Sequence, residues 1–102
     1  MGRRPTNQPP PCTYILASAP HGLLYIGSTR NLVARVWQHK NNVVPSHTRR
    51  HGIHTLVWYE PHHTLENAIL LEKRLTTWSR ARKIALIEGM NPEWDDLYRS
   101  LL

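Results

Sequence analysis

The chain has 102 residues, a formal net charge of +6 and ordinary apolar content, which suits one small globular domain with a modest core. No apolar stretch approaches the roughly 20 residues that a membrane-spanning helix requires, and the first residues lack the apolar run of a secretory signal. The single cysteine, Cys12, excludes an internal disulfide and suits a reducing compartment, so we expect a cytoplasmic protein.

The charges are unevenly distributed along the chain. All seven acidic residues lie at Glu60 or later, so residues 1–59 carry seven Lys or Arg and a formal charge of +7. A half-chain without an acid is typical of a surface that binds a polyanion, although Lys and Arg also serve general solubility. Nucleic acid is the partner that this distribution favours.

Residues 1–11 hold four prolines and almost nothing apolar, which predicts a flexible, partly extended tail before a domain over residues 12–102. The domain begins with two aliphatic and aromatic segments, residues 14–17 and 23–26, separated by Pro20-His21-Gly22. This pattern predicts two short antiparallel strands joined by a tight turn.

The next segment predicts a helix for which Asn31 is the N-cap. One face of this helix carries, at helical spacing, Leu32, Arg35, Val36 and His39. A face beside a core normally carries only apolar groups, so a guanidinium and an imidazole one turn apart indicate a function. Together with the tyrosines of the two strands, they predict a polar cluster next to the core. This cluster is the strongest functional signal in the sequence.

Residues 41–54 contain a proline, a glycine, Arg49-Arg50 and three histidines, which indicates a basic loop able to reach phosphates. An ordinary solvated connection is the alternative. Residues 54–60 are rich in β-branched and aromatic residues and predict a third strand, central and buried, which Pro61 ends.

Thr64 is the predicted N-cap of a second helix over residues 65–78, and its apolar stripe includes Glu72. A carboxylate that faces a sheet needs a cation, a metal or strong donors, because burying it unpaired is costly. The alternative is a surface ion pair with Lys73 or with an arginine.

Two further helices complete the chain, one over residues 80–88 and a short one for which Asn91 is the N-cap. The order of elements is therefore β-β-α-β-α-α-α. This order predicts an α/β protein of the α+β kind.

At its polar cluster the chain resembles the GIY-YIG nuclease superfamily, and in particular its small single-domain bacterial members. Tyr14 stands where the first motif ends in tyrosine, with Cys12-Thr13 in place of Gly-Ile. Tyr25-Ile26-Gly27 reproduces the second motif, and Arg35 falls where the family's helix carries its arginine. The resemblance covers about residues 12–98. It implies a three-stranded antiparallel sheet flanked by helices.

The resemblance also implies a chemistry. The protein would be an endonuclease of DNA, or alternatively of RNA, with Mg²⁺ or Mn²⁺ as cofactor and a role in DNA repair. Tyr14 would be the general base, Glu72 the only protein ligand of the metal and Arg35 the stabiliser of the transition state. Tyr25 and His39 would position the water and relay protons.

Other residues would have supporting roles. Gly27 would be structural, allowing close approach after the strand. Many family members carry an asparagine some dozen residues beyond the glutamate, where this chain has Ile84. Asn91 is the nearest later candidate and fits a helix cap equally well. Nucleic acid would be contacted by Arg30, Lys40, Arg49 and Arg50.

Two other functions fit parts of the sequence. A non-catalytic nucleic-acid-binding module on the same fold explains the basic first half and needs no metal ligand. A small zinc protein would combine Cys12 with His47, His51, or His62 and His63, but one cysteine without paired spacing is a weak basis. A chain of this size has no second domain to read sequence, so we expect specificity to come from the loop after His39, the proline-rich tail, a homodimer or a partner protein.

Overall fold

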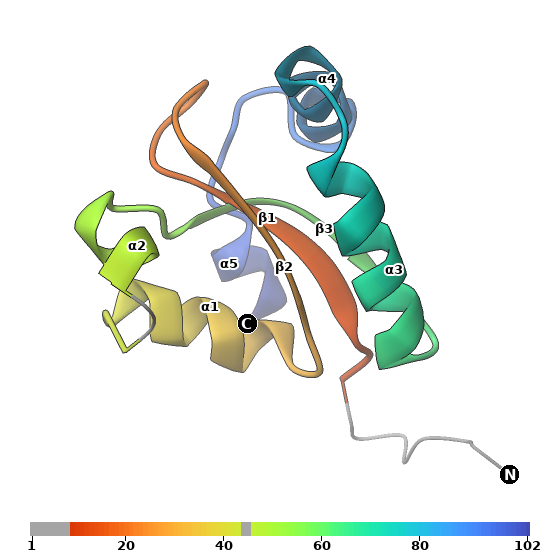
Figure 1. Ribbon diagram of the computed structural model, residues 1–102. Helices are drawn as coiled ribbons and strands as arrows, with labels where there is room; N and C mark the ends of the chain where they lie inside the picture. The colour runs from red at the N-terminus through yellow and green to blue at the C-terminus, as the bar shows by residue number, and fades with distance from the viewer. Residues whose placement is uncertain (1–8, 44–45) are drawn as a thin grey trace, which may run out of the picture.

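The fold is known from a computed structural model that describes residues 9–43 and 46–102 (Figure 1). The predicted tail therefore lies mostly outside the described residues. The elements follow in the order β1 (Cys12–Ala17), β2 (Leu24–Thr29), α1 (Leu32–Lys40), α2 (Ser46–Arg50), β3 (Thr55–Pro61), α3 (Leu65–Thr76), α4 (Arg80–Met90) and α5 (Tyr98–Leu101). The predicted α+β fold, with antiparallel strands flanked by helices, is confirmed.

The three strands are arranged in the order β2-β1-β3, and both pairings are antiparallel. The prediction that residues 54–60 form the central strand was wrong, because β1 lies between its two neighbours. Every residue of β1 is buried. The middle of the edge strand β3, from Leu56 to Trp58, is also buried, since helices cover both faces of the sheet. The apolar composition of residues 54–60 therefore indicated correctly that the strand is buried, but it did not indicate whether the strand lies at the centre or at the edge of the sheet.

Side chains alternate along β1 and divide the core into two layers. One layer faces α1 and α5 and the other faces α3 and α4, the helices on the two sides of the sheet in Figure 1. Tyr14 and Leu16 face α1 and α5, where they pack with Leu32 and Val36. Ile15 and its neighbours on the opposite face pack against α3 and α4. A side chain on β1 therefore belongs to one layer or the other according to its position in the strand.

Three of the four predicted helix starts are confirmed by their caps. The side chains of Asn31, Thr64 and Ser79 each accept a hydrogen bond from the backbone N–H three residues later, at 3.1–3.2 Å. The segment predicted as a loop contains the short helix α2 in addition. Within the described residues, none of the helices has the length and apolar character needed to cross a membrane.

The prediction that Asn91 begins the last helix was wrong. Asn91 instead follows the end of α4. Its buried amide donates to Val57 O at 3.2 Å and to Asp95 O at 2.8 Å, and its Oδ1 accepts from Asp95 N at 3.0 Å. An amide with a donor and an acceptor can bond a turn and a strand at once. Asn91 thereby fastens the turn after α4 to β3.

The C-terminal segment holds the end of α1 on the sheet. The Asp96 carboxylate accepts from the N–H groups of Leu56 and Tyr98 at 3.2 and 3.1 Å and forms an ion pair with Lys40, the last residue of α1. Burial alone would raise the pKa of Asp96, but the Lys40 ammonium and these backbone donors together lower it. The helix that carries the predicted arginine and histidine is thus anchored at its C-terminal end.

Candidate active site

The hydroxyl of Tyr14 reaches across the neighbouring strand at Gly27. The two residues are cross-strand partners, and a Cβ added at Gly27 would lie 2.5 Å from Tyr14 Oη and 2.6 Å from Cζ. Any side chain at this position would therefore collide with the phenol. This geometry supports the structural role predicted for Gly27.

Three rings from three elements meet beside this glycine. The ring centroid of Tyr14 lies 6.4 Å from that of Tyr25 on β2 and 6.2 Å from that of His39 on α1. The centroids of Tyr25 and His39 are 5.5 Å apart. The fold thus brings together the strand tyrosines and the helix histidine that the sequence singled out.

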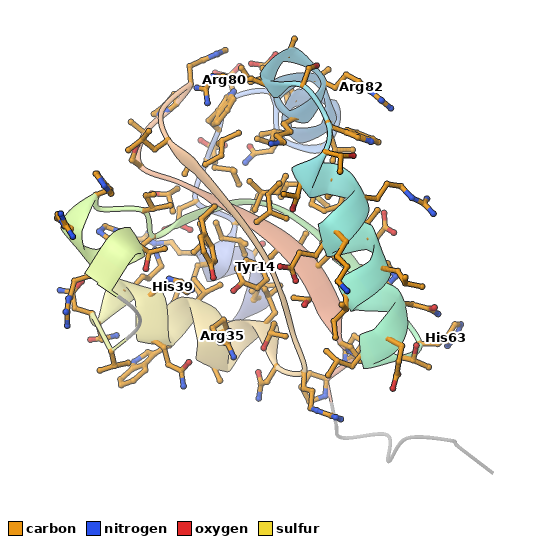
Figure 2. All side chains as sticks on the ribbon, viewed as in Figure 1. Tyr14, Arg35, His39, His63, Arg80 and Arg82 are labelled. Carbon is orange, nitrogen blue, oxygen red and sulfur yellow. The ribbon has the colours of Figure 1, made fainter. Side chains whose placement is uncertain are left out.

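The remaining predicted residues surround the same phenol. Burial raises the pKa of Tyr14 to about 12, with Tyr25 and Glu72 acting in the same direction and the Arg35 guanidinium opposing them. These influences require both charged groups to lie near the phenol. Tyr14 Oη is fully buried and makes no hydrogen bond within the part of the chain that the structure describes. Figure 2 shows Tyr14, Arg35 and His39 on one side of the molecule, with Arg80, Arg82 and His63 further out.

Glu72 occupies the predicted stripe of α3, beside the buried Ala68 and Leu75. Its Oε1 accepts a hydrogen bond of 2.6 Å from Ser28 Oγ on β2, and no ion pair of Glu72 occurs among residues 9–43 and 46–102. The structure therefore does not support the alternative of a surface ion pair between Glu72 and Lys73. Ser28 directly follows the Tyr-Ile-Gly motif. Alternation along β2 would have placed it on the α3 face with Ile26.

His39 is buried, with 2% of its surface exposed. Burial lowers its pKa to about 4, and the charges of Arg35 and His54 act in the same direction. Its imidazole is therefore neutral at pH 7. Within the described residues, its Nδ1 has no hydrogen-bond partner. His54, for which the sequence predicted no role at the site, is a nearby group that helps to keep His39 neutral.

The predicted nucleic-acid contacts differ in their surroundings. Lys40 donates to Asp96 and to His54 O, so its charge is used within the fold and its predicted role gains no support. Arg49 Nη1 donates to Asn42 O at 3.5 Å, and Arg50 is exposed. Arg30 lines a groove beside the polar cluster of Tyr14, Arg35 and His39.

This groove has a volume of about 390 Å³ and lies between α1 and α3. We call it the α1–α3 groove. It reaches the polar cluster at two residues, Arg35 and Ser28, which donates a hydrogen bond to Glu72. Its principal lining residues are Ser28, Arg30, Arg35, Gln38, Leu65 and Ile69. A substrate in this groove would therefore lie directly beside the cluster.

A comparison with known protein families decides the assignment. The family model of the GIY-YIG catalytic domain matches residues 10–85 of the 102. The chain belongs to the GIY-YIG family. No curated protein and no solved structure matches it. The match includes all five predicted catalytic residues, while Asn91 and Asp96 lie beyond it.

Members of the GIY-YIG family are generally nucleases that depend on a divalent metal and act on nucleic acid. A hard ion such as Mg²⁺ is commonly held by one or two carboxylates, with waters and substrate phosphates as the other ligands. Glu72, oriented by Ser28 and close enough to the buried Tyr14 hydroxyl to affect its pKa, fits such an ion. Among residues 9–43 and 46–102, no group of three or more His, Cys, Asp or Glu could hold a metal. Waters and substrate would therefore have to complete the coordination at Glu72.

The buried thiol of Cys12 does not have the character of a metal ligand. Burial raises its pKa to about 11, so it is protonated at pH 7, whereas metals bind the thiolate. Its Sγ donates to Pro10 O at 3.7 Å. These contacts favour a core role for Cys12 over the zinc site considered above.

Proposed function

We propose that this GIY-YIG protein is a divalent-metal-dependent endonuclease that hydrolyses phosphodiester bonds in DNA, using Mg²⁺ or Mn²⁺. The observation that carries the proposal is the Tyr14 hydroxyl, which is buried, has no hydrogen bond of ordinary geometry among the described residues, and is influenced by both Arg35 and Glu72. Leaving such a group unsatisfied costs about 1–3 kcal/mol. A polar group of the substrate or the attacking water would satisfy it, which explains why the fold keeps it.

Hydrolysis requires an attacking water, a proton acceptor and stabilisation of charge on the phosphate. The water oxygen bonds to phosphorus, the bond from phosphorus to the leaving sugar oxygen breaks, and that oxygen takes up a proton. Arg35 would bind the phosphate oxygens with its planar fork and remain charged throughout. A divalent ion on Glu72 would neutralise phosphate charge and lower the pKa of bound water.

Tyr14 would accept the proton of the attacking water. With a pKa of about 12 it is protonated at neutral pH before substrate binds. It therefore acts as a base only after its own proton has left for solvent, which positive charge around the phenol favours, and Arg35 is the protein's own contribution to that charge. Tyr25 and the neutral His39 would orient the water, and His39 would relay a proton only transiently, because its pKa of about 4 makes it a weak base.

We also propose that the functional unit is the domain over residues 12–102, with residues 1–11 as a tail. The hydrogen bonds of Asp96 and the packing of α5 on α1 support this extent, because both lie beyond the family match and both hold the helix of Arg35. Removal of the chain beyond residue 90 should therefore impair the catalytic cluster.

The test separates a nuclease from a non-catalytic binding module. Cleavage of single-stranded, duplex, flapped and branched DNA and of RNA is measured with Mg²⁺, Mn²⁺ or EDTA, and binding is measured in EDTA. Glu72→Gln should reduce cleavage by about 10²-fold or more and leave binding in EDTA unchanged. Glu66→Gln, on the exposed side of the same helix, is the control and should cleave normally. Tight binding by the wild type without cleavage under any condition would favour the binding module.

A further inference from the structure

The α1–α3 groove has one cationic, amide-bearing side and one apolar side. Arg30, Arg35 and Gln38 come from α1 and the turn before it, whereas Leu65 and Ile69 come from the first two turns of α3. None of the residues that line the groove is acidic. Such a surface offers charge, hydrogen bonds and an apolar wall to a single ligand.

The polar groups of the groove are available to a ligand. Within the part of the chain that the structure describes, the Gln38 amide has no hydrogen-bond partner, and the Arg30 guanidinium has neither a hydrogen bond nor an acidic partner. By contrast, Asn31 at the same groove already uses its Oδ1 as a helix cap. The side chains of Gln38 and Arg30 thus form no polar contact with the described part of the fold that would account for their presence in the groove.

The apolar wall distinguishes among ligands. Phosphate groups alone would need only the arginines, and they gain nothing from Leu65 and Ile69. A nucleobase has an apolar face and a hydrogen-bonding edge, which match an aliphatic wall opposite a carboxamide. A base within a duplex has its faces stacked and its edge paired, so only an unpaired base can use both sides of the groove. The volume of about 390 Å³ lies within the usual range for small-ligand sites, about 300–1,000 Å³.

We propose that the α1–α3 groove binds one unpaired nucleotide next to the phosphate held by Arg35, with its base between Gln38 and the wall of Leu65 and Ile69. The position of that phosphate rests on the nuclease function proposed above. The groove then makes single-stranded or locally unpaired nucleic acid the preferred ligand, and Gln38 becomes a residue that selects among bases.

The test follows the methyl groups of the wall by NMR in EDTA, where no cleavage occurs. The full chain is titrated with a short single-stranded oligoadenylate and, separately, with an oligonucleotide of equal length that lacks its bases. A stacked base should shift the Ile69 and Leu65 methyl signals upfield through its ring current, and the abasic ligand should not. The methyl groups of Leu70, which lies on the exposed side of α3, serve as the internal control and should not move.

Affinity measurements on a variant complete the test. Gln38→Ala, a change in a partly exposed helical residue that should fold, is expected to weaken oligoadenylate binding roughly fivefold and duplex binding hardly at all. Asn67→Ala, on the exposed side of α3, should bind like the wild type. Equal methyl shifts with the abasic ligand, or equal losses for both nucleic acids, would overturn the proposal. Base-specific shifts without cleavage would support base binding in the groove and refute the proposed nuclease function. Cleavage without such shifts would support the nuclease function and refute base binding in the groove.

Discussion

Replacing Gly27 by alanine should damage both the stability and the activity of the protein. The added Cβ would lie 2.5 Å from Tyr14 Oη, and an ordinary contact of about 3.4 Å requires the hydroxyl to shift by roughly 1 Å. Tyr14 is fully buried, so it cannot swing into solvent. Overpacking of this kind costs about 1–3 kcal/mol of unfolding free energy. A misplacement of about 1 Å at a catalytic group can reduce the rate by about 10²-fold.

Thermal unfolding and single-turnover cleavage measure the two effects. For a domain of this size, each kcal/mol lowers the melting temperature by about 4–8 °C. Gly89→Ala is the matched control, because nothing lies within 4 Å of a Cβ at this exposed position in α4. Alanine there should stabilise the helix by up to about 1 kcal/mol and leave cleavage unchanged.

A double-mutant cycle tests whether the collision itself is responsible. In a Tyr14→Leu background the phenol is absent, so Gly27→Ala should cost much less than it does in the wild type. The reasoning would be refuted by Gly27→Ala protein that melts and cleaves like the wild type, or by equal costs in the two backgrounds.

Three further predictions concern groups around the cluster. Because the pKa of His39 is lowered, its contribution to stability is present above pH 6.5 and is lost as the pH falls toward about 4. Denaturation midpoints of His39→Gln should therefore fall less over this pH range than those of the wild type. Ser28→Ala removes the donor that orients Glu72 and should weaken divalent-metal binding by about tenfold in calorimetric titration, whereas Ser100→Ala should not. Asp96 also has a lowered pKa, so its stabilisation is present above its ordinary pKa and lost as the pH falls through the lower native value. Asp96→Asn should therefore be less stable than the wild type at pH 7 in chemical denaturation, and this difference should shrink in acid.

Much of the fold is encoded locally and could be predicted from the sequence. The turn residues around His21, the cap at Asn31 and the spacing from Leu32 to His39 each depend on neighbours within one or two turns of chain. The position of β3 at the sheet edge was not predictable in this way, because burial by helices on both faces gives an edge strand the composition of a central one. The role of Asn91 was missed for a similar reason, since its partner Val57 lies 34 residues away.

The candidate site shows the same division. Periodicity identified Arg35, His39 and Glu72 because each interrupts an apolar stripe, and the family match includes all three. Periodicity did not reveal the hydrogen bond from Ser28 to Glu72 or the ion pair of Lys40 with Asp96, because both pairs join distant parts of the chain. The α1–α3 groove likewise exists only once the folded chain brings α1, α3 and the end of β2 together.

The most direct test of the account is single-turnover cleavage by Tyr14→Phe, which removes one buried oxygen and retains the ring. Tyr59→Phe is the control, since Tyr59 lies opposite Tyr14 on the other neighbouring strand. With Mg²⁺ or Mn²⁺ present, the account predicts that Tyr14→Phe cleaves about 10²–10⁴-fold more slowly than the wild type while it binds nucleic acid normally, and that Tyr59→Phe cleaves at the wild-type rate. Equal cleavage by Tyr14→Phe and the wild type would contradict the claim that the Tyr14 hydroxyl is the centre of the active site.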